Sequence, residues 1–136
     1  MRDESGFSLI EILVVIIIIG ILAAIAIPAF LGQKQKSQDG SAKSDARNLA
    51  NLVEACATTG NDYRDCDSAA ELPKTGLDYG SGSGQVRVSD STANSFEVTA
   101  VSNGAGHKFV WTRAAGGTVS RSCTPVDSGG CSGGTW

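Results

Sequence analysis

Histidine is almost absent from this chain of 136 residues, since His107 is the only one. Acid–base and nucleophilic catalysis need several reactive side chains that converge on one site, and histidine is the commonest of them. His107 stands beside a glycine-rich turn, and we expect its side chain to be exposed. The sequence therefore predicts no catalytic residues and a protein that is not an enzyme.

Metal- and nucleotide-binding motifs are also missing. The cysteines form no Cys-x-x-Cys pair and hence no standard zinc site. The glycine-rich tract 80–84 lacks the lysine and the Ser/Thr of a phosphate-binding loop. The acidic residues of the expected loop region 61–84 lack the distal glutamate of a calcium loop, so we expect them to be solvated: Asp62, Asp65, Asp67 and Asp78. The sequence thus indicates no metal and no cofactor.

Charge and aromatic content do not favour a nucleic-acid partner. The chain has 11 basic and 14 acidic side chains, a formal net charge of −3, and only 6% aromatic residues. Such a balance gives no bulk attraction for a polyanion. Lys108, Trp111 and Arg113 could hold a DNA strand by charge and stacking, but three residues make a weak surface. We therefore do not count nucleic acid among the expected partners.

What the chain does contain is one long apolar run, Ile12 to Leu31, interrupted only by Gly20 and Pro28. A helix rises about 1.5 Å per residue, so about 20 residues cross the roughly 30 Å hydrocarbon core of a bilayer. Pro28 removes one backbone hydrogen bond and crowds the carbonyl of Ala24, so a kink or a break is expected there. Gly20 loosens the same helix. We predict a membrane-spanning helix over residues 7–31.

One carboxylate, Glu11, lies at the start of this run. A charge beside lipid costs roughly 2.5 to 3.5 kcal/mol at a helix centre and less toward the interface. Glu11 therefore either marks the membrane boundary, in contact with headgroups, or has a charged partner.

The residues around Glu11 form a recognisable pattern. Gly6-Phe7, Glu11 and the apolar run with Gly20 and Pro28 closely resemble the amino terminus of type IV prepilins and related pilin-like proteins. The resemblance ends near residue 53, and beyond it only the general layout is similar.

The resemblance implies a maturation step and a role for the acidic residue. In that family a prepilin peptidase cuts after the glycine, here Gly6, and methylates the new amino terminus, here Phe7. The acidic residue, here Glu11, pairs with the amino terminus of a neighbouring subunit and so sets the register of a filament. The segment from Gly20 to Pro28 can lose helical order in such filaments, which makes the fibre extensible.

Periodicity predicts the rest of the fold. Apolar residues at spacings of three and four indicate an amphipathic helix over 32–59: Ala42, Ala46, Leu49, Ala50, Val53 and Ala57. Asp39-Gly40 could bend it or be spanned without interruption, and Thr59-Gly60 supplies the stop. Alternation predicts four strands: Gln85–Ser89, Ser95–Val101, His107–Arg113 and Thr118–Ser122. We predict an α+β fold, a long helix packed on an antiparallel meander, with head 60–136.

Aromatic residues divide into two expected groups. We assign Phe96, Phe109 and Trp111 to the core, because they fall on one face of the predicted strands. Exposed positions are expected for Tyr63, Tyr79 and Trp136.

All four cysteines lie beyond the apolar run, which indicates two disulfides in an oxidising compartment. Three pairings are possible, and we favour the local ones, Cys56 with Cys66 and Cys123 with Cys131. The second closure resembles the disulfide-bounded region near the carboxyl terminus of many pilins. We expect the head outside the cytoplasm, although the lysines after the run, counted by the positive-inside rule, point the other way.

These observations lead to one interpretation and two alternatives. We interpret the chain as a type IV pilin: leader 1–6 is removed, and the membrane precursor then polymerises as a homo-oligomer, with the pilus assembly machinery, into a cell-surface filament. A pseudopilin or minor pilin of a type II secretion or DNA-uptake machine shares the whole amino-terminal pattern. A monomeric membrane-anchored binding module explains the helix and the head, but not Gly6-Phe7 with Glu11.

Overall fold

The computed structural model describes residues 6–60 and 62–136. The expected leader, residues 1–6, lies outside the described residues except for Gly6. Contacts divide the chain into two units, Met1–Lys34 and Gln35–Trp136.

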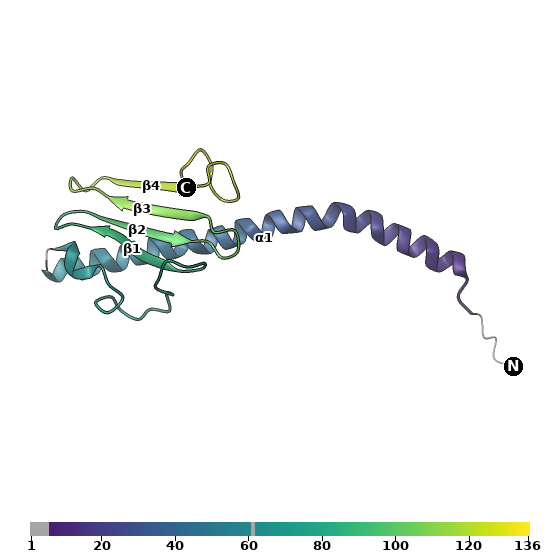
Figure 1. Cartoon of the computed structure of the whole chain (residues 1–136), viewed down its shortest axis with the longest axis horizontal. Coiled ribbons are helices and arrows are strands. Elements are labelled where there is room, and N and C mark those ends of the chain that lie inside the picture. The colour runs from purple at the N-terminus through teal and green to yellow at the C-terminus, as the bar shows by residue number, and fades with distance from the viewer. Residues whose placement is uncertain (1–5, 61) are drawn as a thin grey trace. The chain divides into compact units, whose positions relative to one another are not determined.

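One helix, α1 (Leu9–Gly60), contains both the apolar run and the amphipathic stretch (Figure 1). It continues through Pro28, so a break at this proline is excluded, because a proline removes only one of the many hydrogen bonds that hold a helix of 52 residues. It also continues through Asp39-Gly40, where the sequence allowed either a bend or an uninterrupted helix. The glycine costs about 1 kcal/mol, which burial of the following turns offsets.

The sheet is a four-stranded antiparallel meander in the order β1-β2-β3-β4, as predicted. Its strands are β1 (Val86–Ser91), β2 (Phe96–Val101), β3 (Lys108–Arg113) and β4 (Val119–Thr124). Each begins one residue later than the alternation predicts, and β1 and β4 extend two residues further. The fold class is therefore confirmed as α+β, with one long helix and one small sheet.

The core of the second unit lies between one face of the sheet and α1 (Figure 1). All six apolar residues of the predicted stripe on α1 are buried, and four of them are alanines, which let the sheet approach the helix closely. Leu49, Phe96 and Phe109 are among the largest fully buried side chains. Each such side chain contributes about 1.5 to 3 kcal/mol. The expected core residue Trp111 is partly buried against this cluster.

The loop region contains an element that periodicity did not predict, the 3-10 helix η1 (Tyr63–Cys66). Asp62 caps it by accepting a hydrogen bond from the backbone N–H of Arg64 (2.9 Å), and a disulfide joins Cys56 to Cys66. The expectation that Tyr63 is exposed is wrong. Since the disulfide holds η1 against the end of α1, the Tyr63 ring packs on Phe96, with 4.9 Å between ring centroids.

The other two aromatic residues expected at the surface, Tyr79 and Trp136, are also partly buried against the core. The indole Nε1 of Trp136 donates to the carbonyl of Ser122 in β4 (2.9 Å), so the last residues of the chain lie along this edge strand. The loop acids Asp65, Asp67 and Asp78 are exposed, as expected, and Asp62 is half-buried in its cap.

Candidate functional site

The start of α1 holds Glu11 in a defined position. Ser8 precedes the helix, and its hydroxyl accepts a hydrogen bond from the N–H of Ile10 (3.3 Å). In return, Glu11 Oε2 accepts from the N–H of Ser8 (2.9 Å). This reciprocal arrangement is a capping box, and its signal in the sequence is Ser8-x-x-Glu11, which our sequence analysis missed. Glu11 therefore stabilises its own helix with one oxygen, and among residues 6–60 and 62–136 its Oε1 makes no hydrogen bond, so it can accept one from another partner.

Among residues 6–34, the part of the first unit that the structure describes, nothing covers the apolar side chains around Glu11. Every large apolar side chain from Phe7 to Leu31 is at least 45% exposed. A soluble monomer rarely leaves such a surface in water. The helix is also long and apolar enough to cross a membrane. Residues 7–31 therefore require an apolar environment, either lipid or other apolar helices.

Glu11 is the only acidic residue between Phe7 and Lys34. It borders a shallow apolar hollow that Phe7, Ile10 and Val14 also line. A carboxylate in such a setting attracts a cation strongly once water is excluded, because the low dielectric magnifies the attraction. The arrangement can thus select a partner that brings a positive charge to the start of α1.

The second unit contains a buried polar cluster that sequence analysis missed. His107, expected at the surface, is only 4% exposed, and Asp39 is completely buried. His107 Nδ1 lies 3.0 Å from Asp39 Oδ2, and its Nε2 lies 2.9 Å from the side-chain nitrogen of Gln35. A ring with its proton on Nδ1 satisfies both contacts, since it donates to the carboxylate and accepts from the amide.

The same carboxylate anchors the loop that the second disulfide closes. Cys123 is bonded to Cys131. Within this loop, the N–H of Gly130 donates to Asp39 Oδ2 (2.7 Å), and Lys43 donates to the carbonyl of Gly130. Glycine is needed at Gly129, because φ is +58° there and a Cβ would overlap Asp39 Oδ2. The loop is thereby attached to α1 through its backbone.

Burial by itself would raise the pKa of Asp39. The Ser102 hydroxyl, the Gly130 N–H and His107 favour the charged form, and together they hold the pKa below its ordinary value. The contact between the Ser102 hydroxyl and this carboxylate falls short of a hydrogen bond, and within the described residues neither that hydroxyl nor Asp39 Oδ1 has a hydrogen-bond partner. The carboxylate is therefore ionised at neutral pH, and its environment stabilises that charge.

His107 lies between Asp39 and Ser128, as the histidine of a Ser-His-Asp triad does, but the three residues do not form a catalytic triad. The Ser128 hydroxyl is 3.5 Å from His107 Nε2, while the Gln35 amide is at 2.9 Å and takes the lone pair of that nitrogen. The ring cannot accept a proton from the hydroxyl while the amide occupies it. The cluster holds a loop in place and has no activated nucleophile.

The three residues considered for DNA do not form one surface. Lys108 lies on the opposite face of β3 from Trp111 and Arg113, because side chains alternate along a strand. Arg113 forms an ion pair with Glu54, with 2.6 Å between Nε and Oε1.

Comparisons with known proteins identify a family model for the amino terminus and relatives that match most of the chain. Residues 1–27 match a family model described as "Prokaryotic N-terminal methylation motif". The type IV major fimbrial protein FimA of Dichelobacter nodosus is 34% identical over 143 residues, which cover 91% of each chain. A fimbrial protein of Pseudomonas aeruginosa is 32% identical over 106 residues, 74% of this chain and 69% of that protein.

A second kind of relative comes from secretion systems. The type II secretion system core protein G of Aeromonas hydrophila is 40% identical over 62 residues, 46% of this chain and 43% of that protein. No solved structure is significantly similar to the chain.

Proposed function

Since the chain belongs to the type IV pilin family, we propose that it is a structural subunit of a type IV pilus, stored in the cytoplasmic membrane and polymerised into a cell-surface filament. The observation that carries the proposal is the exposed apolar surface of residues 7–31, whose large side chains are all at least 45% exposed. Both environments that pilins occupy, the bilayer and the interior of a filament, cover such a surface.

The proposal assigns a role to each segment. Residues 1–6 form a leader that prepilin peptidase removes between Gly6 and Phe7, and the new amino terminus at Phe7 is methylated. Residues 7–31 span the membrane and later fill the filament core. The head, residues 60–136, packs against the buried apolar stripe of residues 32–59. Cleavage leaves 10 basic and 12 acidic side chains.

Glu11 gives the proposed assembly its register. When apolar helices stack, burial out of water contributes about 25 cal/mol per Å² but fixes no particular alignment. An unpaired carboxylate in that interior is strongly unfavourable, so each Glu11 needs a cation at a fixed height. The amino group of Phe7 on a neighbouring copy supplies one, and Glu11 Oε1 can accept it while Oε2 keeps its bond to Ser8.

A pseudopilin of a type II secretion machine is the second candidate. The relative from Aeromonas hydrophila favours it, but that similarity covers 46% of this chain, against 91% for the fimbrial relative. The longer similarity includes the head, so we favour the pilus. A minor subunit of such a filament uses the same segments. We propose no catalytic role.

Immunogold electron microscopy, with an antibody against the head, separates the two candidates. A pilus subunit decorates long fibres on cells and in sheared material, and its deletion removes those fibres. A pseudopilin gives no labelled surface fibres, and its deletion instead blocks the release of secreted proteins. Absence of labelled fibres from cells that contain the processed chain would reject the pilus assignment.

A further inference from the structure

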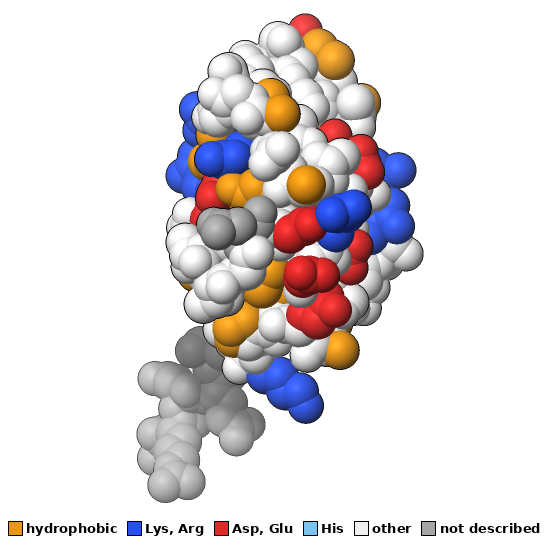
Figure 2. Space-filling model, turned by 90° about the vertical axis from the view of Figure 1, so that its left-hand side faces the viewer, with side chains coloured by type: hydrophobic (Ala, Val, Ile, Leu, Met, Phe, Trp, Pro, Cys, Tyr) orange, Lys and Arg blue, Asp and Glu red, His pale blue; other side chains and the backbone are white. Residues whose placement is uncertain are grey.

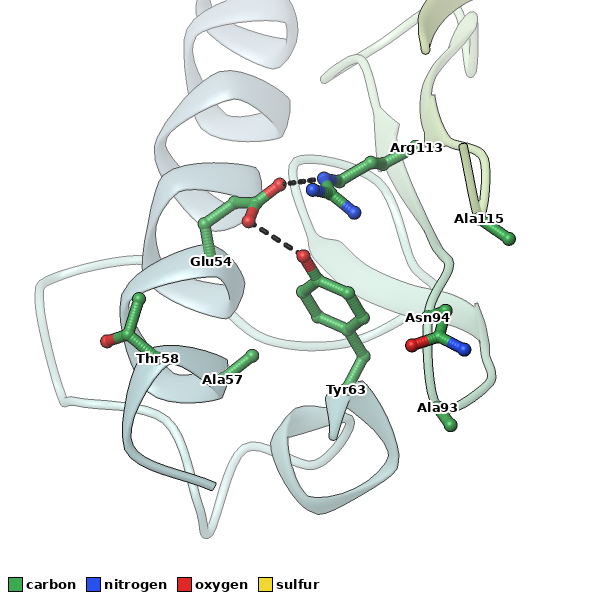
Figure 3. Close-up of a pocket in the computed structure, with 8 residues that line it drawn as sticks. All are labelled: Glu54, Ala57, Thr58, Tyr63, Ala93, Asn94, Arg113 and Ala115. Carbon is green, nitrogen blue, oxygen red and sulfur yellow. Dashed lines mark hydrogen bonds and ion pairs between the residues drawn. The ribbon is translucent and has the colours of Figure 1, made fainter. Parts of the chain in front are cut away.

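A hollow of about 320 Å³ opens where α1 ends (Figure 3). It lies wholly within the second unit, between the last turns of α1, η1 and the turns that follow β1 and β3. On the side of the molecule where α1 ends, acidic and basic side chains lie next to one another and apolar ones are scattered (Figure 2). The hollow itself has a polar wall, since Glu54, Asn94 and Arg113 line it.

Small side chains leave this space open. Three alanines from three different elements line the hollow: Ala57 of α1, Ala93 between β1 and β2, and Ala115 after β3. Each contributes only a methyl group, so no long side chain fills the volume. Its size is at the lower end of ordinary ligand pockets, which span roughly 300 to 1,000 Å³.

A guanidinium group is held in position at the wall of the hollow. Arg113 Nε lies 2.6 Å from Glu54 Oε1, and the Tyr63 hydroxyl donates to Glu54 Oε2 (2.8 Å). The guanidinium carbon of Arg113 is 5.3 Å from the centre of the Tyr63 ring. Figure 3 shows these three groups converging at one side of the hollow. Since two neighbours fix the guanidinium, little freedom is lost when it binds a further group.

Arg113 and Asn94 keep unused donors. Within the described residues, neither terminal nitrogen of Arg113 and no side-chain atom of Asn94 makes a hydrogen bond, although both side chains line the hollow. Two parallel N–H donors of a guanidinium match the two oxygens of a carboxylate or phosphate. The adjacent negative charge of Glu54 disfavours a dianion more than a monoanion, which selects the carboxylate.

We propose that this hollow is a binding site for the carboxylate group of a small polar ligand. The carboxylate accepts two hydrogen bonds from the terminal nitrogens of Arg113, and the Asn94 amide binds a neighbouring polar group of the ligand. Two sources supply such a group at this size, an acidic monosaccharide and the free carboxyl end of a peptide. The site involves no residue of the proposed assembly segment and does not depend on the proposed function.

The test is an NMR titration of the full chain, ¹⁵N-labelled in detergent micelles, with four probes. Glucuronate and an acetylated dipeptide with a free carboxyl group carry the carboxylate, while glucose and the amide of the same dipeptide lack it. We expect saturable shifts of amides at residues 93–94 and 113–115 with at least one carboxylate probe and with neither neutral probe. The probe that binds more tightly identifies the source. Shifts with no probe, or equal shifts with the neutral probes, would overturn the proposal.

Variants assign the binding to the guanidinium. Arg113→Gln should weaken binding by about tenfold or more, since charge-assisted hydrogen bonds are lost. Arg87→Gln, the same charge change at an exposed position of β1, should leave the affinity unchanged. Glu54→Gln keeps an oxygen for Arg113 but removes the repelling charge, so the affinity for the carboxylate should rise. A fall in affinity with Glu54→Gln, or equal weakening by Arg87→Gln and Arg113→Gln, would contradict the assigned geometry.

Discussion

At the scale of single residues, Glu11 has two separable roles. Its Oε2 accepts from the N–H of Ser8 and caps α1, a local contact worth about 1 kcal/mol. Its charge, in the proposed filament, binds the amino group of a neighbouring copy in a dry interior. Leaving one partner of a buried pair alone costs about 3 to 5 kcal/mol, which is far more than the cap. Loss of the charge should therefore affect assembly and leave membrane storage intact.

Glu11→Gln and Glu11→Ala should both leave the precursor in the membrane at normal amounts and reduce sheared filaments by at least about tenfold, because each removes the charge. Immunoblots of membrane and sheared fractions measure both quantities. Ser8→Ala is the matched control, since it weakens the cap and keeps the charge, and it should still assemble. A normal filament yield from Glu11→Gln would show that assembly does not need the charge of Glu11.

Asp39 should make the fold of the second unit sensitive to acid. Because its folded-state pKa lies below the ordinary value, ionised Asp39 stabilises the fold. That stability is complete above the unfolded pKa of about 3.9 and is lost as pH falls through the lower folded value. His107, bonded to Asp39, and Lys43, bonded to the anchored loop, are the other ionisable groups of the cluster.

We expect the free energy of unfolding to fall below about pH 4 more steeply in the unmodified chain than in Asp39→Asn, which should also be the less stable at neutral pH. Denaturant titrations across this range, followed by tryptophan fluorescence, provide the test. Asp90→Asn, at an exposed position of β1, should keep the steep dependence. If the free energy of unfolding depended on pH equally in the unmodified chain and in Asp39→Asn, Asp39 would not be the source of the acid sensitivity.

At the scale of elements, the helix and the strands that follow from local periodicity were predictable from the sequence. Spacings of three and four placed the buried stripe of α1, and alternation placed all four strands within two residues of their ends. Contacts between distant residues were not predictable. His107 is buried because Asp39, 68 positions away, accepts a hydrogen bond from its ring, and no local pattern signals that pair. Tyr63 is buried because a disulfide attaches η1 to α1, so its environment depends on a covalent bond.

The loop between Cys123 and Cys131 depends on a close approach to α1. Comparing alanine substitutions at two glycines separates the effect of this close approach from the effect of backbone strain. Gly129 and Gly133 have the same φ of +58°, but only at Gly129 would a Cβ overlap Asp39. Both alanine variants carry the strain of a left-handed backbone, roughly 1 to 3 kcal/mol. Gly129→Ala should lose a further 1 to 3 kcal/mol or so, because it breaks hydrogen bonds to a buried charge.

Thermal unfolding of the Gly129→Ala and Gly133→Ala variants, at matched protein and detergent concentrations, measures this difference. A lower Tm for Gly129→Ala supports the anchor, and release of the loop should also speed its cleavage by protease. Equal Tm values for the two variants would mean that the contact with Asp39 contributes nothing beyond backbone strain.

At the scale of the whole molecule, the two units have opposite requirements. The second unit buries its own core, whereas the first exposes every large apolar side chain from Phe7 to Leu31. A chain of this kind is stable only in lipid or in an assembly that covers the first unit. Cutting the leader away next to Phe7 would create, at the start of α1, the positive charge that Glu11 needs. Processing and assembly are thereby linked in the proposed function.

Intact mass spectrometry under non-reducing conditions, with amino-terminal sequencing, on fibres sheared from the cell surface tests this account most directly. The account predicts a chain that begins at methylated Phe7 and is four hydrogens lighter than its reduced form, since both disulfides are present. A chain that is found only in the membrane fraction, with residues 1–6 still attached, would contradict the account.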